Sequence, residues 1–321
     1  MTTLRTAVVA ALLALSCLAA TLTGEATAAV PLADGPTLVG ARAEPPAPKP
    51  VPKPPVPKPA PKPPAPKPAP KPKPKPKPVT KTFTGQAFDT CAAPSLATLR
   101  AWHGTSSYGA VGIYIGGRNR SCAQPQLTPS WTRSATAMGW KLLPLYVGSQ
   151  APCLPAKNSS SRIKPSTAVS QGTAEGKDAV KTAKALAVTA GSPIYLDMES
   201  YTRGSSCTLA VMQYTVAWSR AVRASGYLAG FYSSADAGIA DLAAAALTHG
   251  TRAAALDLPD VLWYARWDNR ASTDGYRALS GSLWTGHRRV HQFVGNTKET
   301  HGGVTINIDR NAVDAPVALV H

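Results

Sequence analysis

Short apolar runs alternate with longer amphipathic segments over the last 240 residues of the chain. The short runs are rich in β-branched and aromatic residues, which is typical of buried strands. They predict eight strands, at residues 85–89, 111–115, 142–147, 194–198, 228–233, 261–265, 290–294 and 304–309.

The segments between the early strands have helical periodicity. They predict four helices, at residues 94–102, 129–138, 174–190 and 208–225. The first two begin with Pro94 and Pro129, and proline suits the first turn of a helix. The last two stop at Gly191 and Gly226, as glycine is favoured just past a helix end. Helical patterns become poorly defined beyond residue 250.

Strands that alternate with helices predict parallel strands joined by right-handed crossovers. Eight strands within this length favour a closed barrel over an open dinucleotide-binding sheet. No glycine-rich phosphate-binding motif follows any strand, so we expect no cofactor. We therefore predict an α/β fold, a TIM-like (β/α) barrel at residues 82–321 that is irregular in its second half.

The first 29 residues have the features of a secretory signal peptide. Arg5 precedes an apolar run at residues 7–22, and small residues lead to a cleavage site near Ala28 or Ala29. A membrane anchor is the alternative, but the run is short and interrupted by polar residues. We expect a secreted protein, extracellular or associated with the cell wall, with no stable membrane insertion after cleavage.

Residues 30–81 form a Pro/Lys-rich segment. Between residues 45 and 78 the chain is almost entirely Pro, Lys, Ala and Val, with too little apolar surface to pack. This composition predicts a disordered, extended linker of polyproline II type before the barrel.

The positive charge is divided between this linker and the barrel. The chain has a net charge of +17, and ten of its lysines lie between Lys49 and Lys81. From Thr82 onward, 22 Lys and Arg stand against 14 Asp and Glu, a net charge of +8. An exported basic chain is expected to bind anionic wall polymers, although the lysines could instead only keep a spacer extended. The barrel has no recognisable nucleic-acid motif, so we expect no nucleic-acid partner.

Four cysteines remain after removal of the predicted signal: Cys91, Cys122, Cys153 and Cys207. An even number of cysteines in an exported chain predicts two disulfides, with three connectivities open. No pair has the close spacing that is typical of a zinc site, and we expect no metal.

Asp197 and Glu199 are the first candidates for catalytic residues. They close an apolar strand, and alternate residues of a strand point to the same face. The carboxyl ends of the strands carry the active site in β/α barrels. Because two neighbouring carboxylates repel each other's charge, at least one pKa should be raised, which makes a general acid available near neutral pH.

Asp89 and Asp309 are two further candidates, because they close the first and last predicted strands. These strands are neighbours in a closed barrel, so both acids should meet at the same rim as Asp197 and Glu199. The alternative is that some of the four cap helices or pair with nearby arginines: Arg118, Arg266 and Arg310.

Aromatic residues in or beside the strands, together with one glutamine, are candidates for binding sugar. Sugar rings pack their apolar faces on aromatic rings, although aromatic residues also fill the cores of most barrels. The candidates are Tyr114, Tyr146, Tyr232, Trp263, Trp267 and Gln292.

The order of these motifs resembles one known family. They read Phe88-Asp89, Tyr114-Ile115-Gly116-Gly117, Pro144-Leu145-Tyr146-Val147-Gly148, Tyr195-Leu196-Asp197-Met198-Glu199, Gly230-Phe231-Tyr232-Ser233, Trp263-Tyr264-Ala265-Arg266-Trp267, His291-Gln292-Phe293 and Ile308-Asp309. The series resembles the exported glycoside-hydrolase-like domain family of unknown function from actinobacteria, which is similar to family 25 lysozymes.

This resemblance implies roles for the four acids. Glu199 would protonate the glycosidic oxygen, and Asp197 would stabilise an intermediate formed by the substrate's own N-acetyl group. Asp89 and Asp309 would hold the other rim acids and the sugar. The implied function is lysozyme-like hydrolysis of a wall polysaccharide such as peptidoglycan. The alternative is a catalytically inactive barrel that binds wall carbohydrate.

The cysteines fit the same barrel. One cysteine follows each of the first four predicted strands, and adjacent strands carry adjacent loops. We therefore expect the pairs Cys91–Cys122 and Cys153–Cys207.

Overall fold

The computed structural model describes residues 80–154, 161–249 and 256–321. The predicted signal peptide and nearly all of the predicted linker lie outside the described residues. The first strand begins at Lys81, one residue before the predicted start of the barrel.

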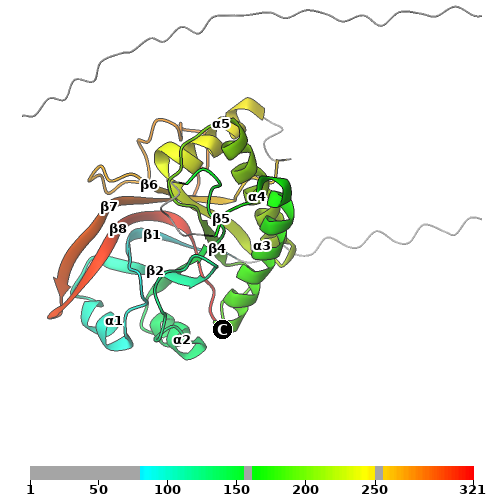
Figure 1. Ribbon diagram of the computed structural model, residues 1–321. Helices are drawn as coiled ribbons and strands as arrows, with labels where there is room; N and C mark the ends of the chain where they lie inside the picture. Colours follow the sequence, from blue (N-terminus) through cyan, green and yellow to red (C-terminus); the bar gives the residue numbers. More distant parts are fainter. Residues whose placement is uncertain (1–79, 155–160, 250–255) are drawn as a thin grey trace, which may run out of the picture. The chain divides into compact units, whose positions relative to one another are not determined.

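Eight strands form a closed barrel in sequence order, which confirms the predicted fold class (Figure 1). From β1 to β7, neighbouring strands pair in parallel. The strands are β1 (Lys81–Asp89), β2 (Tyr108–Gly116), β3 (Lys141–Val147), β4 (Pro193–Asp197), β5 (Leu228–Ser234), β6 (Val261–Ala265), β7 (Arg289–His301) and β8 (Val304–Val317).

The last strand departs from the predicted parallel arrangement. β8 runs antiparallel to both β7 and β1, and with β7 it forms a long hairpin. Gly302 and Gly303 make the connection with φ angles of 55° and 75°. Two residues with positive φ suit a tight hairpin turn, whereas a parallel crossover needs a dozen or more residues. The short connection therefore reverses the direction of β8.

Within the described residues, five α-helices cover the outside of the barrel. They are α1 (Leu96–Trp102), α2 (Pro129–Ala137), α3 (Ala168–Ala185), α4 (Ser205–Ala224) and α5 (Ala240–His249). Short η1 (Pro165–Thr167) and η2 (Ala235–Ile239) precede α3 and α5. No helix joins β6 to β7, a connection in which every residue is described, so the predicted irregular second half is confirmed. None of the described helices is long and apolar enough to cross a membrane.

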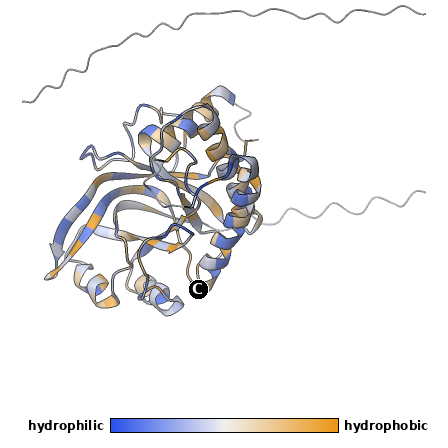
Figure 2. Ribbon diagram, viewed as in Figure 1, coloured by the Kyte–Doolittle hydropathy of each residue, from blue (hydrophilic) through white to orange (hydrophobic). Residues whose placement is uncertain are grey.

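The hydrophobic core has two layers because side chains alternate along each strand. Inward-facing residues such as Leu145, Tyr195 and Trp263 fill the barrel. Outward-facing residues such as Leu196 and Phe231 pack against the helices, which carry both hydrophobic and hydrophilic positions (Figure 2). The barrel interior beneath the carboxyl ends of the parallel strands is therefore filled with side chains.

Candidate active site

A pocket of about 660 Å³ lies at the carboxyl ends of the parallel strands. All four candidate acids line it: Asp89, Asp197, Glu199 and Asp309. Of the candidate sugar-binding residues, Tyr114 and Trp267 also line it. We call this cavity the acidic pocket.

Asp89 and Asp309 face each other across the barrel closure. They are directly paired in the antiparallel register of β1 and β8. Asp89 is buried and accepts hydrogen bonds from Tyr114 Oη (3.1 Å), Gln292 Nε2 (3.1 Å) and Asn311 Nδ2 (2.8 Å). Burial and the nearby charge of Asp309 raise the pKa of Asp89 to about 7, although the three hydrogen bonds act to lower it. Asp89 is therefore partly protonated near neutral pH.

Asp197 and Glu199 stand on the same face, as their alternate positions require. Asp197 is buried, and its Oδ1 atom has no hydrogen-bond partner. Burial, then repulsion from Glu199 and Asp89, raises the pKa of Asp197 well above its ordinary value. Glu199 is exposed to the pocket, and partial desolvation and the charge of Asp309 raise its pKa too. Among the described residues, no group forms a hydrogen bond or ion pair with the Glu199 carboxyl.

Gln292 connects the acids to the aromatic wall. Its Nε2 donates to Asp89 (3.1 Å) and Asp309 (3.2 Å). Its Oε1 accepts from Tyr232 Oη and Trp267 Nε1, both at 3.1 Å. The amide therefore uses both donors and both acceptor positions within the protein. Gln292 thus positions four neighbours, and its contact with sugar stays a prediction.

Trp267 is the exposed aromatic residue of the acidic pocket. Its side chain is 61% exposed, while its ring nitrogen is fixed by Gln292. The ring lies against Gly295, where a Cβ atom would come within 1.9 Å of it. Trp267 is thus held in place yet open to a ligand.

Two predicted sugar-binding residues lie away from the pocket. Tyr146 is buried and donates to Asp178 of α3 (2.8 Å), because its strand turns Leu145 and Val147 inward and Tyr146 outward. Trp263 is completely buried inside the barrel and donates to Asn311 (2.8 Å). Both are core residues, and core packing was the alternative to sugar binding for each aromatic candidate.

Tyr232 lies between the core of the barrel and the acids of the pocket. It packs edge-on against Trp263 and is half-buried above the core. Burial and then the charges of Asp197, Glu199, Asp89 and Asp309 raise the pKa of Tyr232 well above its ordinary value. Tyr232 therefore stays protonated and donates to Gln292 beside the acids.

The nearby arginines pair with other acids. Arg118 pairs with Glu175 (3.6 Å), Arg266 with Asp268 (3.4 Å), and Arg310 with Glu299. Arg120 also lines the acidic pocket, but within the described residues no arginine forms an ion pair with any of the four acids. Burial is the largest cause of their raised pKa values.

Gln150 is a site residue that the sequence analysis missed. It is buried, and its side chain accepts from Glu199 N (2.7 Å) and donates to Asp197 O (2.9 Å) and Gly148 O (3.2 Å). It thereby fixes the backbone on both sides of Met198, between the two acids. No periodicity marks it, because it lies in the loop after β3. Asn311, the other omission, could have been found from its same-face position two residues after Asp309.

Two disulfides, Cys91–Cys122 and Cys153–Cys207, have the expected pairing. Cys91 and Cys122 also line the acidic pocket, so the first disulfide forms part of its wall. Two disulfides in one domain are typical of proteins outside the cytoplasm.

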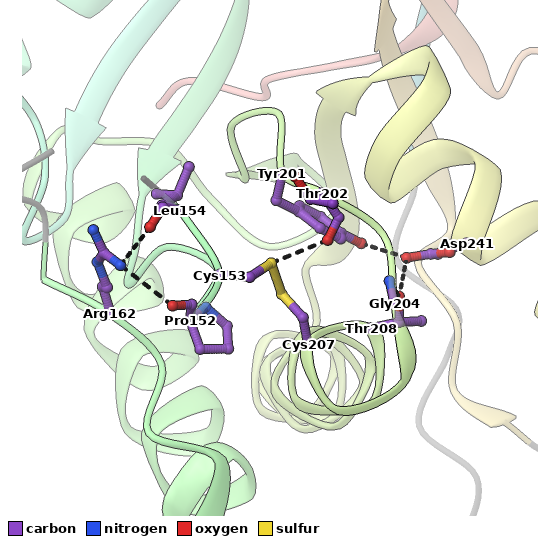
Figure 3. Close-up of a disulfide and its surroundings, with 10 residues drawn as sticks. All are labelled: Pro152, Cys153, Leu154, Arg162, Tyr201, Thr202, Gly204, Cys207, Thr208 and Asp241. Carbon is purple, nitrogen blue, oxygen red and sulfur yellow. Dashed lines mark hydrogen bonds between the residues drawn. A yellow bond between two sulfur atoms is a disulfide. The ribbon is translucent and has the colours of Figure 1, made fainter. Parts of the chain in front are cut away.

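The second disulfide links the loop after β3 to α4 (Figure 3). Beside it, Asp241 of α5 accepts hydrogen bonds from Tyr201 Oη (2.7 Å) and Thr208 Oγ1 (2.9 Å). The segment that follows Glu199 is therefore tied to two helices. Among the described residues, no cluster of His, Cys, Asp or Glu is arranged to hold a metal ion.

Comparison with solved structures gives distant similarities. An uncharacterised B. stearothermophilus protein has a TM-score of 0.48 and 17% identity, covering 72% of this chain and 99% of that one. The Tat-secreted protein Rv2525c of Mycobacterium tuberculosis, in complex with L-tartrate, has a TM-score of 0.44 and 17% identity (72% and 96%). The spore cortex lytic enzyme SleM of Clostridium perfringens has a TM-score of 0.44 and 11% identity (72% and 67%).

No curated protein matches the chain. Residues 100–313, about two thirds of the sequence, match the family described as "Rv2525c-like, glycoside hydrolase-like domain". The match covers the strands from β2 onward, including the Asp-x-Glu segment, and confirms the resemblance found from the motifs. The chain belongs to the Rv2525c-like, glycoside hydrolase-like domain family.

Proposed function

We propose that the protein is a glycoside hydrolase that cleaves an N-acetylated glycan of the cell wall, such as peptidoglycan. The observation that carries this proposal is the acid pair of the acidic pocket. Glu199 is open to the pocket and unpartnered, and Asp197 lies beside it with a free buried carboxyl oxygen. Unpartnered buried polar atoms are rare, and many serve a function.

In this proposal Glu199 is the general acid. Burial and the charge of Asp309 raise its pKa, which favours the protonated form that a general acid needs. The proton passes to the glycosidic oxygen as the bond to the anomeric carbon breaks. Glu199 is suited to this step because its carboxyl group needs to break no hydrogen bond within the described residues.

Asp197 stabilises the intermediate. The carbonyl oxygen of the substrate's acetamido group attacks the anomeric carbon, and positive charge develops on that group. In the empty pocket, burial favours the neutral form of Asp197. Positive charge beside it favours its ionised form, so Asp197 releases its proton to solvent, and its carboxylate then stabilises the charged acetamido group. Water then attacks the anomeric carbon, and Glu199 accepts a proton from it.

Trp267 provides the surface for a sugar ring. Its exposed ring borders the acids, and its position is fixed from behind by Gln292 and Gly295. An aromatic face of this kind packs on the apolar face of a pyranose. We assign the binding of the neighbouring sugar to it.

We further propose that the protein is secreted and acts at the cell wall. The two disulfides and the signal-like first 29 residues support export. The Pro/Lys-rich residues 30–81 would act as an extended linker that binds anionic wall polymers through its lysines.

A carbohydrate-binding barrel without turnover is the second candidate. Asp89 is fully hydrogen-bonded, which favours a structural role for at least one of the acids. Glycan binding alone would require only the open pocket and Trp267.

Turnover distinguishes the two candidates. The purified protein is incubated with peptidoglycan and with chitin oligomers, and released reducing ends are counted. We expect Glu199→Gln to lower the rate by about 10²–10⁴-fold. Asp257→Asn, which removes an acid paired with Arg220 away from the pocket, is the control and should keep the rate. Equal rates for Glu199→Gln and the parent would refute the mechanism. Binding without release from either glycan would support the second candidate.

A further inference from the structure

A second cavity, of about 710 Å³, lies towards the other end of the barrel. Its walls come from the β6–β7 connection, residues 273–289, and from Asp314 of β8. Asp314 accepts a hydrogen bond from Thr84 Oγ1 (2.7 Å), and Thr84 precedes Asp89 by five residues of β1. At about 3.3 Å per residue, the cavity lies about 17 Å along the strand from the acidic pocket. We call it the loop cavity.

The connection that forms the loop cavity is held by a buried arginine. Arg289 donates from Nη1 to Asp274 (2.7 Å) and from Nη2 to Leu279 O (3.1 Å) and Ser280 O (3.3 Å). Its Nε donates to Leu283 O (3.2 Å). A rigid guanidinium with this many fixed carbonyl partners sets the course of an otherwise irregular segment. The loop cavity is therefore preformed.

Backbone conformation in the same connection is unusual. Trp284 and His287 have φ angles of 48° and 59°, and Gly275 and Gly286 have 92° and 69°. Left-handed backbone at a bulky residue such as Trp284 is an outlier. Residues of this kind concentrate at ligand sites, where the surrounding structure maintains them. All four line the loop cavity.

Both acids of the loop cavity have partners within the described residues. Asp274 pairs with Arg289 (2.7 Å). Asp314 accepts from Thr84 and lies 2.6 Å from His287 Nδ1.

Two arginines of the loop cavity lack an acidic partner. Arg288 donates from Nε to Thr285 O (2.8 Å) but pairs with no acid within the described residues. Arg277 is exposed, and its side chain forms no hydrogen bond or ion pair with any described residue. The loop cavity thus contains two guanidinium groups with unused donors and no free carboxylate.

We propose that the loop cavity binds a phosphate group of a phosphodiester-linked wall polymer, through Arg277 and Arg288. Guanidinium groups match the oxygens of phosphate with paired donors. The acidic pocket is lined by four carboxyl groups and one arginine, Arg120, whereas the loop cavity offers two guanidinium groups without an acidic partner among the described residues. A polyanion is therefore favoured at the loop cavity. Because the disulfides are typical of an extracytoplasmic protein, we choose a wall polymer over nucleic acid as the occupant.

This proposal does not depend on hydrolysis at the acidic pocket. It assigns a second, separate contact with the wall, which would hold the barrel on its substrate surface. A polymer bound there would leave the acidic pocket free to open toward a glycan.

The test compares the full chain with Arg277→Gln/Arg288→Gln. Poly(glycerol phosphate) is titrated into each protein at low salt, and the dissociation constant is measured. We expect the double variant to bind about tenfold more weakly, since it loses the charge-assisted hydrogen bonds of two arginines. The control is Arg100→Gln/Arg133→Gln, which removes the same charge from exposed positions on α1 and α2.

Hydrogen exchange locates the contact independently of the linker lysines. We expect the polymer to slow amide exchange in residues 273–289 of the parent and not of Arg277→Gln/Arg288→Gln. Equal weakening in the control variant, or unchanged exchange in these residues, would overturn the proposal. Tighter binding of single-stranded DNA or of polygalacturonate would overturn the choice of a phosphodiester wall polymer.

Discussion

Replacement of Asp89 by asparagine should stabilise the protein at neutral pH. In the folded protein, Asp89 Oδ2 accepts from both Gln292 and Asn311, and Oδ1 accepts from Tyr114. An asparagine can place its oxygen where Oδ2 lies, to accept from Gln292 and Asn311. Its NH₂ group then lies where Oδ1 was and donates to the hydroxyl of Tyr114, which can accept a hydrogen bond as well as donate one. Asp89→Asn therefore preserves the contacts of the buried group and removes only its ionisation.

The magnitude follows from the pKa of Asp89, which is 3.8 for an unperturbed group and about 7 in the folded protein. Between these values the folded state holds a proton that the unfolded state has lost, so stability falls as pH rises from 3.8 to about 7. At about 1.36 kcal/mol per pKa unit, the total loss is about 4 kcal/mol. Asp89→Asn should recover an amount of this order at pH 8 and nothing below pH 4.

Urea unfolding of both proteins between pH 3.5 and 8 would measure this difference. Asp314→Asn is a control of opposite sign. Burial acts to raise the pKa of Asp314, but hydrogen bonds from Thr84 and His287 outweigh it and lower the pKa. Its stabilising effect is present above the unfolded pKa and lost as pH falls through the folded one, so Asp314→Asn should destabilise at pH 8. A stability gain for Asp89→Asn that did not vary with pH would refute the reasoning.

Two other substitutions test how the acidic pocket is held. Gln150→Ala leaves the amide of Glu199 without its partner, and we expect a loss of about 1–3 kcal/mol in unfolding free energy with a lower rate of turnover. If the rate of turnover and its dependence on pH were unchanged in Gln150→Ala, Gln150 would not position the acids. Gly295→Ala places a methyl group where the ring of Trp267 lies, so the affinity for glycan, measured by titration, should fall. Trp267→Ala should lower it to a similar extent. Gly281 lies in open space, so the control Gly281→Ala should bind glycan as tightly as the parent.

The strands of the barrel could be predicted from the sequence because buried strands have a strong local signal. All eight predicted strands overlap observed ones. The direction of β8 could not be predicted from alternation alone, since it depends on the turn at Gly302 and Gly303. Asp309 was predicted to end its strand, but β8 continues to Val317, so Asp309 lies in the middle of the strand. It still reaches the rim beside Asp89.

The acidic pocket was predictable where chemistry follows the strand ends. Asp197 and Glu199 lie where alternate positions place them. Tyr146 lies outside the pocket because Leu145 beside it on β3 points inward and successive side chains point to opposite faces. Gln150 was missed because a hydrogen bond from a loop side chain to the backbone of another strand depends on tertiary packing and leaves no periodic trace.

Closure of the barrel by β1 and β8 has a consequence for folding. Asn311 reaches Asp89 across 222 residues of sequence, and the acids of the two strands become neighbours only through that closure. Contacts between such distant segments form slowly, because a long loop must close before they contribute. A chain that is still being synthesised lacks β8 and cannot complete the acidic pocket. The pocket therefore forms only after the last strand has emerged, when the whole domain is free to fold.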